Sequence, residues 1–308
     1  MKIGTIDIGT NSMRLLIADY KNNKIENRKK YINITRIGQG VDDKGYITEE
    51  ALERNLNALK EFADKGIEEK CEKVYCMGTS ALRDSKNGQD FVNRAKELTN
   101  IDVKIICGEE ESNLGFIGVL EGAGGDKSNY ILVLDIGGGS TEFIVGNEDG
   151  IKFCKSENVG ALRMTEKFIT TDPISDEEFN KMSDFIEETI SSTLDKIKGM
   201  HVSKLVGIGG AITSLSAMNQ QLEVYSMEKV HNSVVTKKDL EKILQNLKKM
   251  TLSDKKTIKG LQPKRADIIT AGVKILHIVM EKLEIEKIMI SEYDNLEGLI
   301  CQNSKKMS

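Results

Sequence analysis

The sequence predicts an α/β protein made of two similar domains, and three observations support this. The chain has 308 residues, which is enough for two domains that each bury their own core. Strand-like and helical patterns alternate along it, as in layered α/β proteins. The stretch IDIGTNSMRLLIA (6–18) returns as LDIGGGSTEFIVG (134–146), so one structural unit occurs twice.

Each copy of this repeat predicts a β-hairpin, because a second strand pattern follows the glycine turn where a dinucleotide-binding unit would have a helix. Between the two copies we expect four elements in order. They are a helix at 47–66, a strand and a turn across CEKVYCMGTSALRD (71–84), a helix at 90–100 and a strand at 101–108. The second half predicts three helices and a strand, near 175–199, 236–250, 264–283 and 286–291.

The composition limits the classes of function. The formal net charge is −4 and the pI is near 5.7, which argues against a protein that binds DNA or RNA. The five cysteines are scattered without a C-x-x-C pair, as expected for a reduced compartment without zinc or disulfides. No secretory or membrane-spanning pattern is found, so we expect a cytoplasmic protein.

The second hairpin turn predicts a metal–phosphate site. Gly137–Gly139 bring backbone N–H groups close to a ligand, and the ligand usually held in this way is a phosphate. Asp135 and Glu142 flank the turn and would repel a phosphate unless a divalent metal lay between them. A hairpin turn with no function is the alternative for a single copy. Two copies predict two domains that hold one phosphate chain from opposite sides.

A third glycine pair, Gly209–Gly210, lies in LVGIGGAITSLSAM (205–218), where a strand leads into a helix. Its N–H groups could bind an anion or a nucleoside. A tightly packed turn is the alternative reading, since the third glycine of a dinucleotide fingerprint is missing.

The helix that starts at EEESNLGFIGVLEG (109–122) carries a candidate general base. Glu109 and Glu110 fit a structural role as acids near the positive end of a helix. The face of Glu111 continues through glycines at 115, 118 and 122, which cost about 1 kcal/mol each relative to alanine. We therefore expect another segment, such as the opposing domain, to approach closely there. A carboxylate at the head of that face could orient and deprotonate a water molecule.

The chain resembles the exopolyphosphatase/guanosine pentaphosphate phosphohydrolase family of the actin–Hsp70–sugar kinase superfamily. The resemblance rests on eight motifs in chain order: IDIGTNSMRLLIA, GTSALRDSKN, ICGEEESNLGFIGV, LVLDIGGGSTEF, NVGALRMTEKF, GIGGAITSLSAM, KRADIITAGVKIL and SEYDNLEGLI. It implies two actin-like (ribonuclease H-like) domains that face each other across an interdomain cleft. The expected boundaries are 1–118 plus 295–308 for the first domain and 119–294 for the second.

The resemblance also implies roles for site residues. Glu111 would be the general base, and Asp135 and Glu142 would hold Mg²⁺, with Mn²⁺ as the alternative. The phosphate-binding residues would be Asp7, Thr10, Asn11, Ser12, Arg14, Arg83, Gly137, Gly138, Gly139, Ser140, Thr141, Gly209, Gly210 and Arg265.

By the same resemblance, the chain would be a metal-dependent exopolyphosphatase that releases orthophosphate from inorganic polyphosphate, without a membrane partner and as a homodimer. It resembles the short, two-domain members, because it ends just after SEYDNLEGLI. The alternatives are a guanosine pentaphosphate (pppGpp) 5′-phosphohydrolase, with guanosine penta- or tetraphosphate as ligand, an ATP-binding actin- or Hsp70-like conformational module and a small-molecule kinase.

Two basic runs, 21–30 and 254–265, each hold five Lys or Arg. A solvated loop or helix face is the simpler reading. The alternative is a track for the distal part of a polyanion.

Overall fold

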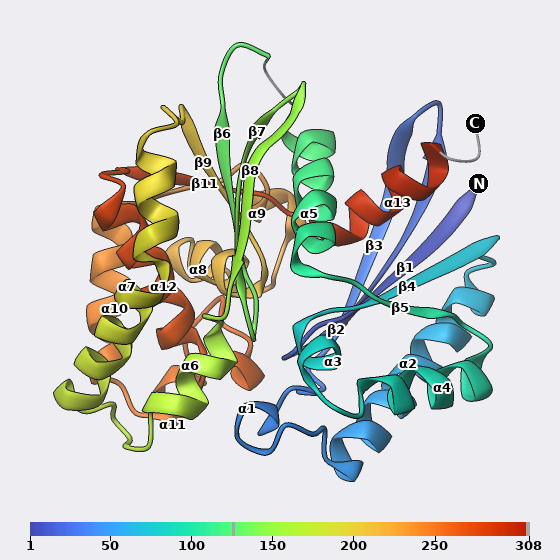
Figure 1. The fold of residues 1–308 in the computed structure, drawn as a ribbon, viewed down its shortest axis with the longest axis horizontal. Coiled ribbons are helices and arrows are strands. Elements are labelled where there is room, and N and C mark those ends of the chain that lie inside the picture. Colours follow the sequence, from blue (N-terminus) through green and yellow to red (C-terminus); the bar gives the residue numbers. More distant parts are fainter. Residues whose placement is uncertain (125–126, 306–308) are drawn as a thin grey trace. The chain divides into compact units, whose positions relative to one another are not determined.

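The computed structural model describes residues 1–124 and 127–305. The chain forms two compact units, drawn together in Figure 1 and described separately below. Unit 1 comprises Met1–Glu121 and Tyr293–Ser308, and unit 2 comprises Gly122–Glu292.

Unit 1 is built on a five-stranded sheet in the order β3-β2-β1-β4-β5. Strands β1 and β2 form an antiparallel hairpin that β3 extends, whereas β4 and β5 run parallel to β1. The strands are β1 (Lys2–Ile8), β2 (Met13–Lys21), β3 (Lys24–Asn33), β4 (Lys73–Gly78) and β5 (Val103–Ile105). The helices are α1 (Val41–Lys44), α2 (Glu49–Glu68), α3 (Ser80–Asp84), α4 (Gly88–Thr99), α5 (Gly108–Ala123) and α13 (Asn295–Lys305).

Both faces of this sheet are covered, because its central strands are apolar on both sides. Leu15 and Ile17 of β2 belong to one core cluster, together with side chains of α2 and α4. Leu16 belongs to a separate cluster with Leu296 and Ile300 of α13. The last helix of the chain therefore completes the core under the first hairpin.

Unit 2 repeats this arrangement around a six-stranded sheet in the order β10-β11-β9-β6-β7-β8. An antiparallel meander, β6-β7-β8, is again joined to parallel strands, here β9 and β11. The strands are β6 (Ile131–Ile136), β7 (Thr141–Asn147), β8 (Gly150–Glu157), β9 (Lys204–Ile208), β10 (Val234–Thr236) and β11 (Lys287–Ile290). The helices are α6 (Ala161–Phe168), α7 (Asp176–Lys198), α8 (Gly210–Asn219), α9 (Met227–Val230), α10 (Lys237–Lys249), α11 (Leu252–Lys255) and α12 (Ile269–Lys282), with a 3₁₀ turn η1 at Pro263–Arg265.

The structure confirms both predicted hairpins, and their registers match. Asp7 pairs with Arg14 across β1 and β2, and Asp135 pairs with Glu142 across β6 and β7. The predicted helices at 47–66, 175–199 and 236–250 are confirmed as α2, α7 and α10. No helix within the described ranges, 1–124 and 127–305, is long and apolar enough to cross a membrane.

Three local expectations are wrong. The predicted turn after β4 is the short helix α3, and the predicted helix at 264–283 begins only at Ile269, after η1. The first basic run does not lie on a loop or helix face, because residues 24–30 belong to edge strand β3. Three of its cations pair with carboxylates: Lys29 with Glu69, Arg28 with Glu297, and Lys30 with Asp294 and Glu297.

Candidate functional site

The first hairpin turn, residues 9–12, turns its amide groups away from its own carbonyl partners. Gly9 N–H donates to the Ser12 carbonyl at 3.0 Å, which closes the turn. The carbonyls of Thr10 and Asn11 each accept a 3.0 Å hydrogen bond from a separate loop, from the N–H groups of residues 38 and 36. Within the described part of the chain, the N–H groups of residues 10, 11 and 12 have no acceptor. Three neighbouring donors of this kind suit an anion.

The second turn, residues 137–140, has the same hydrogen-bond pattern. Gly137 N–H donates to the Ser140 carbonyl at 3.0 Å. The three glycine carbonyls are bound by the start of α6: Ala161 N–H donates to Gly137, Leu162 and Arg163 N–H donate to Gly138, and Arg163 Nε donates to Gly139, at 2.7 to 3.0 Å. The N–H groups of residues 138, 139 and 140 again have no acceptor among the residues that the structure describes.

Gly160 and Arg163 hold this second turn in place, and no role was predicted for either from the sequence. A Cβ on Gly160 would lie 2.4 Å from the carbonyl carbon and oxygen of Gly138. Only glycine therefore lets α6 begin directly against the turn. The signal in the sequence was the motif NVGALRM, where a glycine stands just before a helix.

Three of the hydroxyl groups predicted to bind phosphate have partners inside their own unit. Thr10 Oγ1 and Ser80 Oγ are 2.8 Å apart. Ser140 Oγ donates to Glu142 Oε1 at 2.7 Å, and Thr141 Oγ1 donates to the Val159 carbonyl at 2.5 Å. The donors that remain at both turns are thus mainly backbone N–H groups.

The two carboxylates predicted to hold a metal lie opposite each other in unit 2. Asp135 and Glu142 are cross-strand neighbours, and both are buried. Ser140 Oγ and Ser156 Oγ each donate to Glu142 Oε1 at 2.7 Å, which fixes that carboxylate. No group of three or more His, Cys, Asp or Glu that could hold a metal occurs within residues 1–124 and 127–305. The pair fits a hard divalent cation that takes its remaining ligands from phosphate oxygens and water.

The third turn brings other predicted residues together in unit 2. A Cβ on Gly209 would lie 2.5 Å from Asp135 Oδ1, and a Cβ on Gly210 would lie 2.0 Å from Arg265 Nη1. The backbone of Gly209 also has a φ of +92°, which favours glycine. Arg265 is buried against this turn and donates to Ser214 Oγ at 3.5 Å.

A buried tyrosine and carboxylate, neither predicted from the sequence, belong to the same unit. Burial and the carboxylate of Glu292 raise the pKa of Tyr225 above its usual range, although Arg265 lowers it. The Tyr225 hydroxyl donates to Glu292 Oε1.

Glu111, the predicted general base, is buried in the first turn of α5. Arg83 Nη1 lies 3.3 Å from Glu111 Oε2 and donates to the Ile106 carbonyl at 2.9 Å. Arg83 was predicted to bind phosphate, and the structure places it beside the predicted base. The pairing fixes the direction of the Glu111 carboxylate.

The glycine face behind Glu111 does not wait for the opposing domain. A Cβ on Gly118 would lie 2.0 Å from the backbone oxygen of Asp294, which belongs to the same unit. In return, a Cβ on Gly298 would lie 1.9 Å from the backbone oxygen of Leu114. The close approach is therefore between α5 and the start of α13.

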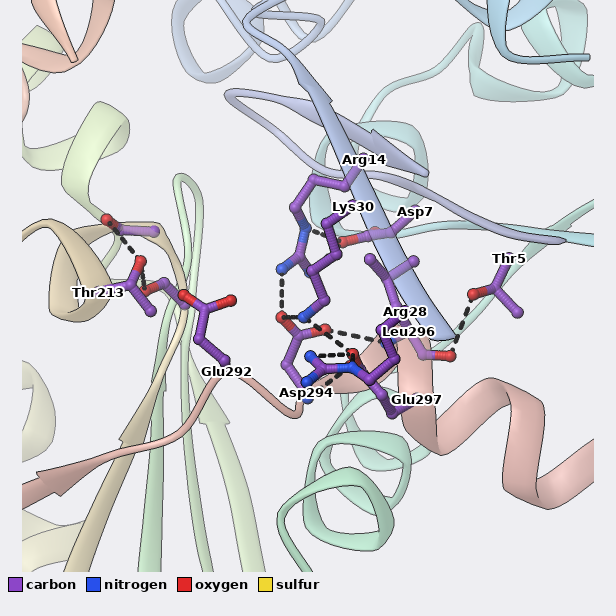
Figure 2. A network of polar contacts seen from close by, with 12 residues as sticks. Thr5, Asp7, Arg14, Arg28, Lys30, Thr213, Glu292, Asp294, Leu296 and Glu297 are labelled. Atoms are coloured by element: carbon purple, nitrogen blue, oxygen red, sulfur yellow. Dashed lines mark hydrogen bonds and ion pairs between the residues drawn. The ribbon is translucent and has the colours of Figure 1, made fainter. Parts of the chain in front are cut away.

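Arg14, another predicted phosphate ligand, lies between two carboxylates of unit 1 (Figure 2). Its Nε and Nη2 donate to Asp7 Oδ2 at 3.1 and 2.5 Å, and its Nη1 donates to Asp294 Oδ2 at 2.7 Å. Asp7 Oδ1 and Asn11 Oδ1 are buried and have no hydrogen-bond partner among the described residues. Burial raises the pKa of the Asp7 carboxyl above its usual value, although Arg14 lowers it.

This geometry defines a class of protein: an α/β protein with two sheets, each of which carries a glycine hairpin whose backbone N–H groups form an anion site. The model of the Ppx/GppA phosphatase family matches residues 16–307. The chain belongs to this family, and the predicted fold class is confirmed, because solved members share the two-domain actin-like fold.

The chain is similar to three curated proteins of different activity. It is 38% identical over 310 residues to the bifunctional 3-dehydroquinate synthase/phosphatase of Fusobacterium nucleatum subsp. nucleatum, covering 97% of this chain and 46% of that protein. It is 30% identical over 311 residues to exopolyphosphatase 2 of Mycobacterium tuberculosis, covering 97% of both chains. It is 26% identical to the guanosine-5′-triphosphate,3′-diphosphate pyrophosphatase of Photobacterium profundum, covering 98% of this chain and 59% of that protein. The chain thus spans about half the length of the first and third relatives.

Two solved structures have a similar fold along the whole chain. An exopolyphosphatase from Cytophaga hutchinsonii has a TM-score of 0.91 at 30% identity, covering 99% of this chain and 98% of that one. The Ppx/GppA family member of Aquifex aeolicus has a TM-score of 0.84 at 29% identity, covering 100% and 99%.

Proposed function

We propose that the chain hydrolyses the terminal phosphoanhydride bond of inorganic polyphosphate and releases orthophosphate. The observation that carries the proposal is the pair of hairpin turns with one shared hydrogen-bond pattern, each with three backbone N–H groups for an anion. The likeness to a relative named exopolyphosphatase over 97% of both chains supports it.

In the proposed reaction, Glu111 accepts a proton from a water molecule whose oxygen attacks the terminal phosphorus. The bond from that phosphorus to the bridging oxygen breaks, and the shortened chain keeps the bridging oxygen and its electron pair. Arg83 orients the Glu111 carboxylate through the 3.3 Å pair. A divalent metal held by Asp135 and Glu142 would supply positive charge that neutralises phosphate oxygens, and we assign Mg²⁺, with Mn²⁺ as the alternative.

The test is phosphate release from long-chain polyphosphate, pppGpp and ATP in parallel, with Mg²⁺, for the wild type and Glu111→Gln. Loss of a general base lowers the rate by about 10²–10⁴-fold. Glu110→Gln is the matched control, because Glu110 precedes the base in the same helix turn but pairs with Lys104. Full activity of Glu111→Gln would remove Glu111 from the role.

The same assay separates the second candidate, a pppGpp 5′-phosphohydrolase, which the likeness to the Photobacterium enzyme favours. A higher kcat/KM for pppGpp than for polyphosphate would select it. Tight nucleotide binding without any phosphate release would select an ATP-binding conformational module. Release that requires a second, phosphate-accepting substrate would reveal a kinase.

The proposal keeps three further predictions from the sequence. Both turns would bind phosphates of one chain, so that damage to either turn weakens polyphosphate binding. The protein would act in the cytoplasm as a homodimer, which its mass in solution tests. The basic runs are not proposed as a track, because the first run pairs with carboxylates and Lys255 and Arg265 of the second run are buried.

A further inference from the structure

The first residues of α13 carry charges that meet the first hairpin inside unit 1. Asp294 and Glu297 lie among Arg14 of β2 and Arg28 and Lys30 of β3 (Figure 2). These five residues are named the cap network below. Their side chains are 17% exposed or less, so the pairs are screened little by solvent.

Within the cap network, only Asp294 touches Arg14 and thereby reaches Asp7. Asp294 Oδ2 accepts from Arg14 Nη1 at 2.7 Å and from Lys30 Nζ at 3.2 Å, while Oδ1 accepts from Leu296 N–H at 3.0 Å. Burial opposes ionisation, but the charges of Arg14 and Lys30 hold the pKa of Asp294 well below its usual range. Asp294 is therefore a fixed anion at the N-terminus of α13.

Glu297 belongs to the same network but serves different partners. Its Oε1 accepts from Arg28 Nη2 at 2.6 Å and from Lys30 Nζ at 3.0 Å. Its Oε2 accepts from the N–H of Asp294 at 2.9 Å. Glu297 is as deeply buried as Asp294 and lies three residues away, so it offers a matched control.

Arg14 has a choice that Asp294 decides. A guanidinium beside a phosphate site is a strong phosphate ligand. Here all three donor positions, Nε, Nη1 and Nη2, are engaged by Asp7 and Asp294. Without Asp294, Arg14 would keep Nη1 for the anionic substrate, and the contact that orients Asp7 would weaken.

We propose that Asp294 is a positioning residue for phosphoanhydride hydrolysis: it holds Arg14 on Asp7 Oδ2, so that Asp7 Oδ1 stays aimed as an acceptor for a water molecule of the substrate complex. Two observations carry this inference. Asp7 Oδ1 is buried without a partner in the part of the chain that the structure describes, and Asp7 directly precedes the first anion turn. The inference rests on the proposed function for the reaction itself.

The charged and titratable groups that face Asp7 come from three elements. They are Arg14 on β2, Asp294 before α13 and Cys76 on β4. The charge of Asp294 raises the pKa of Asp7. Removal of that charge therefore lowers the pKa of Asp7, and Asp7 remains ionised to a lower pH. A variant that only loosens the fold would not produce this shift.

The experiment measures phosphate release against pH for the wild type, Asp294→Asn and Glu297→Gln, together with thermal denaturation. Asparagine keeps the hydrogen bond that caps α13 but removes the charge, and Asp294→Ser is a second variant of the same kind if Asp294→Asn does not fold. We expect Asp294→Asn to lower kcat by about 10–100-fold, as the loss of an outer partner of a site does, with no rise in KM. Its acid limb moves to lower pH. In Glu297→Gln the limb does not move.

A wild type that is active, with superimposable acid limbs for Asp294→Asn and wild type, overturns the inference. Equal shifts in Asp294→Asn and Glu297→Gln overturn it too. A wild type without phosphate release ends the proposed function but not this test. In that case NMR of the protein with ¹³C-labelled Asp side chains, assigned with Asp7→Asn, follows the titration of Asp7. A lower midpoint in Asp294→Asn supports the inference, and an unchanged midpoint overturns it.

Discussion

Gly160→Ala is the sharpest test of the second anion turn, because a single methyl group meets the turn itself. The new Cβ would lie 2.4 Å from the carbonyl carbon and oxygen of Gly138 and 2.5 Å from the carbonyl carbon of Gly139. Backbone atoms cannot rotate away as a side chain can, so α6 and the turn must separate. Overpacking of this kind costs about 1–3 kcal/mol. Unit 2 is of a size for which each kcal/mol lowers Tm by about 2–4 °C, so we expect a decrease of about 2–12 °C.

The same substitution also changes function, because α6 binds all three carbonyls of the turn. Separation frees those carbonyls and disturbs the N–H groups for the anion. We expect weaker binding of tripolyphosphate by calorimetry and a lower kcat/KM for phosphate release. Gly199→Ala is the matched control: Gly199 is in the same unit, has an ordinary φ of −75° and would place its Cβ 3.7 Å from the Lys196 oxygen. A Gly160→Ala protein with the Tm and affinity of Gly199→Ala would refute the reasoning.

Two more predictions concern the carboxylates. Arg83→Met removes the partner of Glu111 but keeps most of the aliphatic stem, so kcat should fall while Tm changes little; Arg94→Met, which removes a surface arginine paired with Glu49 and Glu53, should leave kcat unchanged. Chelation by EDTA should abolish phosphate release, and Asp135→Asn should raise the Mg²⁺ concentration needed to restore it; restoration at the wild-type concentration would remove Asp135 from the metal site.

Much of the fold could be predicted because its signals are local. The two hairpins follow from alternating apolar residues around glycine turns, and α2, α7 and α10 follow from helical periodicity. Strand β3 could not be predicted in the same way. Its sequence KIENRKKYIN is charged, and the acids that pair with it lie more than 260 residues further along the chain.

The site could be predicted as a set of residues but not as a set of contacts. Spacing alone identified Glu111 and the turns. Arg14 was expected on phosphate, because its partner Asp294 is 280 residues away and no local pattern connects the two. Gly118 was assigned to the opposing domain for a similar reason, since the segment that contacts it belongs to the C-terminal end of unit 1.

The comparison of the two turns argues that their shared geometry serves an anion and not only the reversal of the chain. A hairpin needs the bond from its first N–H to its last carbonyl, and both turns have it. It does not need its inner carbonyls to be bound by a separate segment. In the first turn a loop at residues 36–38 supplies those donors, and in the second turn helix α6 supplies them. Two unrelated segments thus produce one result, carbonyls that are bound and N–H groups that are left for a ligand. A purely structural turn gives no reason for that repetition, whereas a phosphate chain does.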